Sequence, residues 1–243
     1  MTSYREIAPP PALARLVECF WTSTSRGGGD SHRVLPDGCI DILFDLESRR
    51  EPFVVGTMTR AEVVVAEKPS TLLGVRFRPG GAAAWLGVPA HELTDGHADV
   101  GQLVRRDFEW RGVIEGNVES AVSELGLALM PRAVDRRIER RVSIATERLL
   151  SFEGSSSIAT LASDLGMSRQ HLARLFAAHV GISPKLFARI QRLQTALFEL
   201  RDGRDLTSIA LHSGYSDQPH LNLDCRELAG VTPLEWLAEK DAG

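Results

Sequence analysis

The side chains best suited to chemistry lie in one short stretch around residue 170. SRQHLARLF, residues 168–176, predicts a helix whose apolar face is Leu172, Leu175 and Phe176. The opposite face carries Ser168, Arg169, Gln170, Ala173 and Arg174. Arginine bonds guanine in a bidentate manner, glutamine bonds adenine and alanine touches the thymine methyl, so this face has the groups needed for direct base readout. Ser168 is suited to cap a helix N-terminus, where phosphate is favoured. The alternative is a solvated helix face.

This stretch belongs to a pattern that occurs twice, 48 residues apart. The shared positions are Ala162, Gly166, Leu172 and Phe176 in the first copy and Ala210, Gly214, Leu221 and Cys225 in the second. Each copy closes with Gly-x-Ser/Thr-Pro, at residues 181–184 and 230–233. A small residue that lets helices cross closely, a glycine turn and a second apolar-periodic segment favour a helix-turn-helix. In the second copy, Gln218, His220 and Asn222 take the exposed positions.

A long helix is expected between the two copies. Apolar residues recur there at spacings of three and four, and they are Leu186, Phe187, Ile190, Leu193, Leu197 and Leu200. Pro184 stands where the first turn of a helix tolerates proline. One such stripe would be buried against both helix-turn-helix units.

Residues 157–240 resemble the tandem helix-turn-helix domain of AraC-type transcription regulators, through SRQHLARLF, GISP, IALHSGYSDQPHL and GVTPLEW. The resemblance implies a partner, double-stranded DNA, bound by two recognition helices in successive turns of the major groove. Two residues depart from the family pattern. Leu223 stands where the family usually carries an arginine that reaches the DNA backbone, and Cys225 where it carries a buried phenylalanine. The smaller cysteine costs about 1 to 3 kcal/mol unless the core repacks.

Charge divides unequally between the two units. The whole chain has a formal net charge of −4. Residues 157–200 hold five bases and two acids, a net charge of +3, whereas residues 201–243 hold four bases and eight acids, a net charge of −4. Because phosphate contacts need positive charge, we expect the first unit to dominate DNA binding.

The N-terminal part of the chain predicts a small β-domain. Short runs rich in valine, isoleucine, phenylalanine and threonine are broken by glycine, proline and aspartate, and they are LVECFWTST, CIDILFDL, FVVGTM, AEVVVA and TLLGVRFR. In the second and last of these runs, apolar residues alternate with Asp41, Arg76 and Arg78. After Pro79 the pattern becomes helical. The expected fold class is therefore α+β: a small β-sheet or barrel domain closed by helices, then an all-α domain of two helix-turn-helix units joined by a long helix.

Through VLPDGCIDILF and LLGVRFRPGGAAAWLGVP, this front part resembles a poorly characterised sensor-like domain found ahead of some AraC-type domains. That resemblance implies a regulatory module whose partner is a small-molecule effector or a second copy of the chain. Asp41, Arg76 and Trp85 are candidate effector-binding residues, although they also fit a solvated sheet face. His32, His91 and His97 lack metal-ligand spacing, and no metal or cofactor is expected.

Residues 132–150 predict a connecting helix with Ile138, Val142, Ala145 and Leu149 on one stripe. It either docks domains or dimers, or caps the N-terminal core. SFEGSSS follows as a hinge. The expected domains are residues 1–130, a regulatory domain; 131–156, the connecting helix and hinge; and 157–240, the DNA-binding domain.

Composition limits the remaining classes of protein. The sequence has no apolar run of membrane-spanning length and no signal peptide, so a cytoplasmic protein is expected. Its three cysteines share no CxxC spacing, which argues against disulfides and thiolate zinc sites. With no catalytic constellation, an enzyme is not expected. The hypothesis is a sequence-specific transcription regulator, which would contact RNA polymerase if it activates. The alternative is an interaction protein that pairs with another regulator because its second unit binds DNA weakly.

Overall fold

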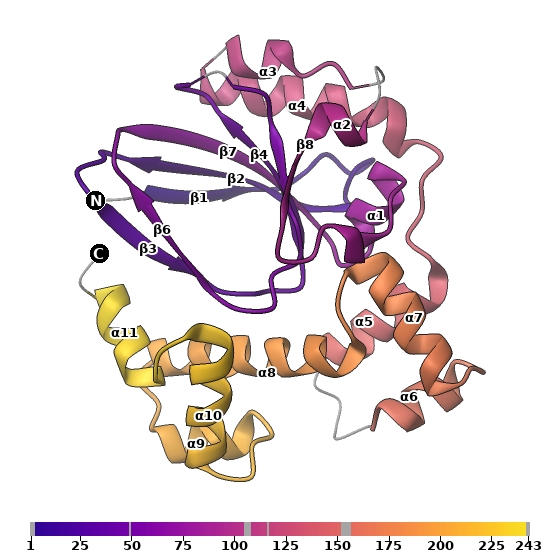
Figure 1. The fold of residues 1–243 in the computed structure, drawn as a ribbon, viewed down its shortest axis with the longest axis vertical. Coiled ribbons are helices and arrows are strands. Elements are labelled where there is room, and N and C mark those ends of the chain that lie inside the picture. Colours follow the sequence, from indigo (N-terminus) through magenta and orange to yellow (C-terminus); the bar gives the residue numbers. More distant parts are fainter. Residues whose placement is uncertain (1–2, 49, 105–107, 116, 152–156, 242–243) are drawn as a thin grey trace.

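The first half of the chain folds around an antiparallel sheet. The computed structural model describes residues 3–48, 50–104, 108–115, 117–151 and 157–241. The sheet has six strands in the order β1-β2-β7-β4-β5-β8. Their bounds are β1 Ser3–Ile7, β2 Val17–Ser25, β7 Ser70–Phe77, β4 Ile40–Asp45, β5 Phe53–Val55 and β8 His97–Asp99. A separate two-stranded ribbon pairs β3 (Asp30–Val34) with β6 (Glu62–Ala66). Figure 1 shows this ribbon on the side of the domain nearer the C-terminal helices.

Alternation along the central strands separates a core face from a polar face. Ile42 pairs with Val75 and Phe44 with Leu73 on the core side, and all four are fully buried. On the opposite side, Asp41 pairs with Arg76. The period-2 pattern of the sequence is thus confirmed in β4 and β7.

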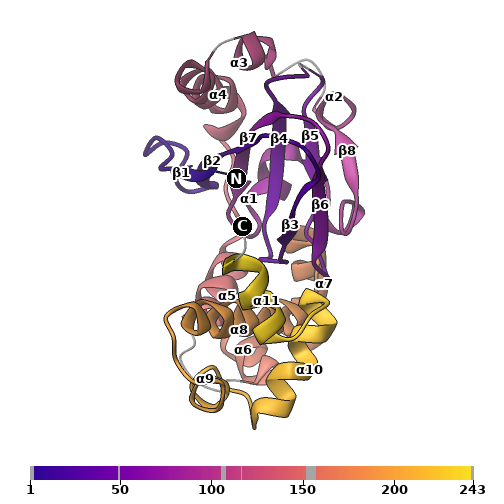
Figure 2. The same cartoon turned by 90° about the vertical axis from the view of Figure 1, so that its left-hand side faces the viewer.

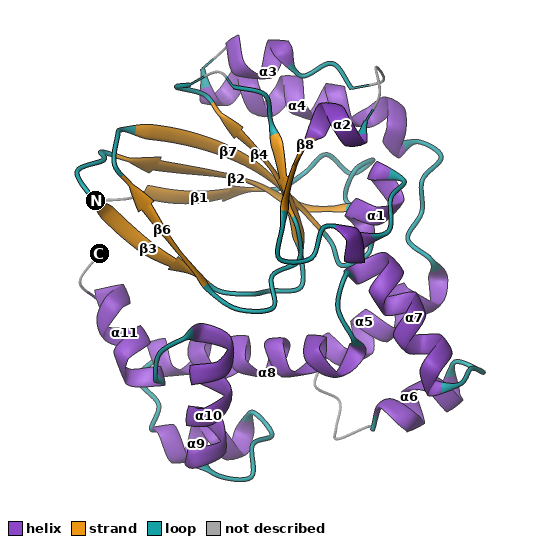
Figure 3. Cartoon of the chain, in the orientation of Figure 1, coloured by secondary structure: helices purple, strands orange, loops and turns teal. Residues whose placement is uncertain are grey.

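Short helices close the core face of the sheet. They are α1 (Gly81–Leu86), the 3-10 turn η1 (Ala90–Glu92), α2 (Val100–Leu103), α3 (Arg111–Glu115) and α4 (Val118–Ala133). Helix α4 presents Ala121, Leu125 and Leu129 to the core, all without solvent exposure. Figure 3 shows these purple helices on one side of the orange strands.

The second half of the chain is all helical. Its elements are α5 (Arg140–Leu150), α6 (Ile158–Asp164), α7 (Arg169–Val180), α8 (Pro184–Arg201), α9 (Leu206–His212), α10 (Gln218–Ala229) and α11 (Pro233–Asp241). Helix α8 lies between the pairs α6–α7 and α9–α10, with the β-domain stacked above (Figures 1 and 2). The predicted α+β class, with two helix-turn-helix units joined by a long helix, is confirmed.

The single helix expected over residues 132–150 is wrong. Helix α4 ends at Ala133 and α5 begins at Arg140. Arg15 stabilises the chain where α4 ends, because its guanidinium donates to the carbonyls of Ala133, Val134 and Arg136. Glu139 then caps α5 by accepting the backbone N–H of Val142 at 2.9 Å.

Helix α5 packs with the helices that follow it. Val142 and Ala145 are fully buried in the same hydrophobic cluster as Leu172 and Phe176. Ile138 packs against this cluster and also against the hydrophobic core of the β-domain. Most of the expected hinge, residues 152–156, lies outside the described residues. The domain boundaries stay a prediction.

Gly74 provides a test of this sheet. A β-carbon built there would lie 2.0 Å from the Trp21 ring. We expect Gly74→Ala to lower the free energy of unfolding by about 1 to 3 kcal/mol, the usual cost of overpacking. Gly96→Ala is the control, because its β-carbon would meet nothing closer than 3.5 Å. Urea unfolding of both variants measures the difference, and equal midpoints would contradict the close packing of Trp21.

Candidate nucleic-acid interface

The first helix-turn-helix unit presents one helix face to solvent. Ser168 caps α7 by accepting the backbone N–H of His171 at 3.2 Å. Leu172 and Phe176 are fully buried, while Arg169, Gln170 and Arg174 are exposed and Ala173 is half-buried. Neither arginine forms an ion pair with any other residue that the structure describes. These side chains therefore remain available for a ligand, and their contact with DNA remains a prediction.

The turn between α6 and α7 follows from its small residues. Ala162 is 1% exposed, so the two helices approach each other closely. Gly166 has φ 67°, in the left-handed region that a β-carbon disfavours. Ser157 caps α6 by accepting the backbone N–H of Thr160. Local sequence thus determines which face α7 presents.

The second unit repeats this geometry with different side chains. Asp217 caps α10 by accepting the backbone N–H of His220 at 2.8 Å, and Gly214 has φ 77°. The His220 ring, however, lies edge-on to Tyr215 at 5.2 Å and its Nδ1 is 3.1 Å from Ser216 Oγ. Gln218 and Asn222 are half-buried. The predicted base-reading groups of α10 are therefore less free than those of α7.

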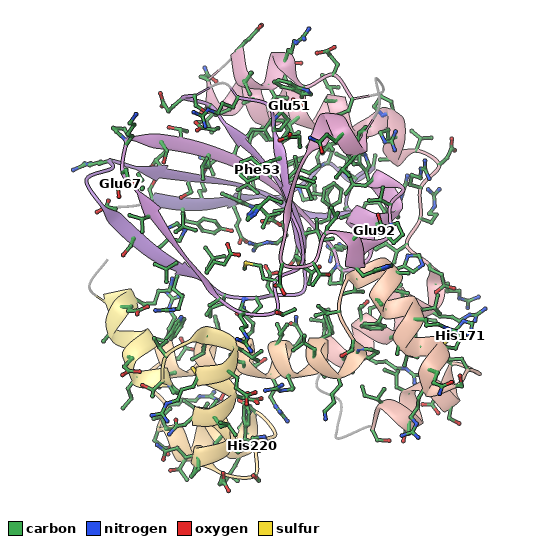
Figure 4. All side chains as sticks on the ribbon, viewed as in Figure 1. Glu51, Phe53, Glu67, Glu92, His171 and His220 are labelled. Atoms are coloured by element: carbon green, nitrogen blue, oxygen red, sulfur yellow. The ribbon has the colours of Figure 1, made fainter. Side chains whose placement is uncertain are left out.

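The N-terminal ends of both recognition helices point away from the β-domain. Figure 4 labels His171 in the first turn of α7 and His220 in the first turn of α10, and both lie far from the sheet, on separate units. The first turns of the two helices thus lie on the side of the helical half that faces away from the sheet. A duplex that contacts both helices would bind on this side.

A groove of about 1060 Å³ separates the two units. Two of its residues, Arg148 and Lys185, were not among the binding residues predicted from the sequence. Arg148 pairs with Asp164 at 2.8 Å, whereas Lys185 is exposed and forms no ion pair within the described part of the chain. Only the structure reveals this site, because its residues come from α5, α6, α8, α9 and α10.

An ion-pair network on the groove wall joins α10 to α8. Asp224 Oδ1 accepts from Arg189 Nη2 at 2.7 Å and Oδ2 accepts from Arg192 Nη2 at 3.1 Å. Glu227 also accepts from Arg189. Burial alone would raise the pKa of Asp224, but hydrogen bonds from the two arginines hold it below its usual value.

This network changes the charge argument made from the sequence. Arg189 and Arg192 were counted with the first unit, yet their charges are offset by acids of the second. The bases that stay unpaired in residues 157–200, among described residues, are Arg169, Arg174 and Lys185. The expected dominance of the first unit therefore rests on these three residues.

The candidate effector residues divide between two sides of the sheet. Arg76 Nε lies 3.3 Å from Asp37 Oδ2 and 3.5 Å from Asp41 Oδ1, and Trp21 Nε1 donates to Asp41 Oδ2 at 2.9 Å. Burial raises the pKa of Asp41 to about 7, although Arg76 opposes that shift. Asp41 and Arg76 thus form a half-buried polar cluster with Asp37.

Trp85 does not belong to this cluster. It is 1% exposed in the core, packs against Phe77 and Phe108, and donates its indole N–H to the Leu129 carbonyl at 3.1 Å. The prediction that one pocket contains Asp41, Arg76 and Trp85 is wrong, because alternation along β7 places Arg76 and Phe77 on opposite faces.

Known proteins match the chain in two separate regions. Residues 161–239 match a family described as "Helix-turn-helix domain", and residues 5–99 match a "Domain of unknown function (DUF6597)". The HTH-type transcriptional regulator VirS of Mycobacterium tuberculosis is 35% identical over 104 residues, which are 43% of this chain and 30% of VirS. The bifunctional transcriptional activator/DNA repair enzyme Ada of Escherichia coli is 32% identical over 89 residues, 37% of this chain and 25% of Ada. The matches thus span less than a third of either relative.

A solved structure is covered along nearly the whole of its own length. It is a probable AraC family transcriptional regulator from Rhodopseudomonas palustris, 30% identical, with 41% of this chain and 96% of that one covered at a TM-score of 0.38. The chain belongs to the AraC family. The resemblance found in the sequence is confirmed, and the AraC-type domain is a DNA-binding module of transcription regulators.

The described residues contain neither a candidate membrane span nor a candidate metal cluster. No described helix of this AraC-family chain is both long and apolar enough to span a bilayer. Within the same residues, histidine, cysteine, aspartate and glutamate side chains nowhere gather in threes as a metal site would require.

The two recognition helices of an AraC-type domain can be compared by one substitution in each. We expect Arg174→Ala to weaken binding to the specific site by about 1 to 3 kcal/mol, the value of a good base contact. His220→Ala should cost less, because that ring is engaged with Tyr215 and Ser216. Titration of both variants against an operator selected from genomic fragments measures the difference. Equal losses would contradict unequal contributions of the two helices.

Leu223 tests whether the groove wall faces the DNA backbone. Its side chain is 56% exposed, and Glu227 lies one helical turn further along α10, also on the groove. An arginine at 223 would pair with Glu227, so Leu223→Arg alone should steepen the salt dependence only slightly. Combined with Glu227→Gln, it should steepen the slope by about 0.9, one phosphate contact. Affinities at several salt concentrations give the slopes. An unchanged slope in the double variant would show that this wall faces away from the backbone.

Proposed function

We propose that the chain is a sequence-specific transcription regulator that reads DNA mainly through α7. The observation that carries this proposal is the exposed face of α7, where Arg169, Gln170 and Arg174 project beside a buried Leu172 and Phe176. Arginine and glutamine supply the donors that guanine and adenine recognise in the major groove. Lys185, in the first turn of α8 and on the groove, adds a positive charge suited to phosphate.

The second unit contributes placement more than base readout in this proposal. Asp224 and Glu227 neutralise the α8 arginines, and Leu223 offers no charge to phosphate. An acidic second unit still limits where a duplex can lie, since like charges repel it. The predicted contacts of Gln218, His220 and Asn222 are secondary.

A second candidate function has its own support. Acids on the groove wall and an exposed Leu223 favour a chain that pairs with another regulator and binds operators poorly by itself. Sequencing the genomic fragments that the purified full chain retains separates the two. A single enriched motif supports direct readout, whereas no enrichment supports the pairing function.

Regulation by the N-terminal domain is the finer part of the proposal. The β-domain contacts the helical half directly, for example through Gln191 Nε2, which donates to the Asp37 carbonyl at 2.6 Å. Asp37 also neighbours Arg76 in the polar cluster. A small molecule that altered this cluster would therefore change the contact of the β-domain with α8, provided that it preferred one arrangement of the two halves.

Comparison of a C-terminal fragment with the full chain tests that regulation. The fragment begins at residue 135, because Val142 and Ala145 of α5 belong to the helical core. We expect a small-molecule extract of cells to change the operator affinity of the full chain by at least about fivefold, the low end of ordinary coupling between sites. The fragment's affinity should not respond. Identical behaviour of both proteins under every condition would refute a sensing domain.

A further inference from the structure

The β-domain binds the C-terminal ends of both recognition helices. Thr57 Oγ1 donates to the Val180 carbonyl at 2.6 Å, and Thr94 Oγ1 donates to the Gly181 carbonyl at 2.7 Å. These are the last residue of α7 and the glycine that ends it. The Thr57 side chain is fully buried, so this contact is closed to water.

The same arrangement occurs at α10. The backbone N–H of Ala61 donates to the Leu228 carbonyl at 2.7 Å, and Arg33 Nη1 donates to the Ala229 carbonyl at 3.0 Å. Arg33 also forms two hydrogen bonds of 2.9 Å with Glu239 on α11. Carbonyls at a helix C-terminus lack partners within their own helix, so donors from another domain hold them strongly.

One short loop reaches both helices. Thr57, which holds α7, and Ala61, which holds α10, both lie in the connection between β5 and β6. They lie four positions apart, and an extended chain of that length spans at most about 14 Å. The loop is itself braced, because Thr59 donates through its backbone N–H and its hydroxyl to Asp95. The distance between the two helix ends is thus limited by a braced segment of the other domain.

Close packing leaves this contact little freedom. A β-carbon on Gly181 would lie 2.9 Å from Thr94 Oγ1 and 3.1 Å from Thr57 Oγ1, and one on Gly38 would lie 2.5 Å from the Phe187 ring of α8. Both glycines have positive φ. The backbone of each half therefore lies in close contact with the other half. The β-domain cannot shift along the helices without losing these hydrogen bonds.

We propose that Thr57, Ala61, Thr94 and Arg33 form a clamp that fixes the separation of α7 and α10 and thereby sets the half-site spacing that the protein accepts in DNA. The inference rests on the proposed function, since it needs both helices on one duplex. One base pair changes the separation of two half-sites by about 3.4 Å and rotates one about the axis relative to the other. A clamped pair of helices rejects such a change, whereas a loosened pair tolerates it. Thr57 and Arg33 are positioning residues, because they act through the recognition helices.

The test uses the full chain and three duplexes. One duplex carries the operator selected from genomic fragments, and the others have one base pair added or removed between the half-sites. Wild-type protein should prefer the natural spacing by about tenfold, the order of one lost base contact. Thr57→Val combined with Arg33→Gln should reduce that preference to about threefold or less. The preference is a ratio within one protein, so a general loss of affinity does not alter it.

Control variants show whether a lost preference for natural spacing comes from the clamp contacts or from a general folding defect. Thr57→Ser keeps the hydroxyl and should keep the preference for natural spacing. Thr71→Val removes a hydroxyl that donates to Glu47 within the β-domain, far from either recognition helix, and should also keep it. If the double variant fails to fold, Arg33→Gln alone is measured, since Arg33 lies at the edge of the ribbon.

The outcomes distinguish two failures. If wild-type protein retains no specific fragment, the proposed function fails. If it binds the operator but accepts all three spacings equally, or if the loosened variants discriminate as well as wild type, the clamp is refuted while the proposed function stands.

Discussion

The apolar stripe of α8 is the constraint on which the helical half depends. Phe187 and Ile190 are fully buried and Leu193 and Leu197 nearly so, and the stripe touches helices of both units. Neither unit could bury its apolar surface alone, because each has only two short helices. The Phe187 ring meets Phe176 edge-on at 5.9 Å on one side, while Gly38 of the β-domain packs on the same ring. A single residue therefore ties α7, α8 and the β-domain together.

Electrostatics then gives the two units different roles. Asp224 is 3% exposed and holds two arginines, so α10 is attached to α8 by charge as well as by apolar contact. Burial favours this pairing, because a desolvated charge without a partner would cost several kcal/mol. The same pairing removes two cations from the surface that would face phosphate. The arginines that attach the second unit are therefore less available to phosphate.

The sequence predicted the helix-turn-helix units well because their signals are local. Ser168, Gly166 and Gly181 each determine a cap or a turn within a few residues. It could not predict that Arg189 pairs with Asp224, since those residues lie 35 positions apart and meet only through the fold. The place of Trp85 was predicted wrongly for a similar reason, because its partners Phe108 and Leu129 lie 23 and 44 positions further along the chain. Strand β3 was missed because DSHRV lacks the apolar alternation that marks a buried face.

Contact between the two halves has a physical consequence for any control of DNA binding. The β-domain supplies hydrogen-bond donors to backbone carbonyls of α7 and α10, not to their exposed faces. It therefore leaves the exposed side chains of α7 uncovered and contacts the two helices at their backbone. An effector bound to the β-domain would act through such contacts, which include Thr57, Arg33 and the hydrogen bond from Gln191 to the Asp37 carbonyl. Control in this molecule would then act on the geometry of two sites together, because a backbone hydrogen bond carries no information about which side chains a helix presents.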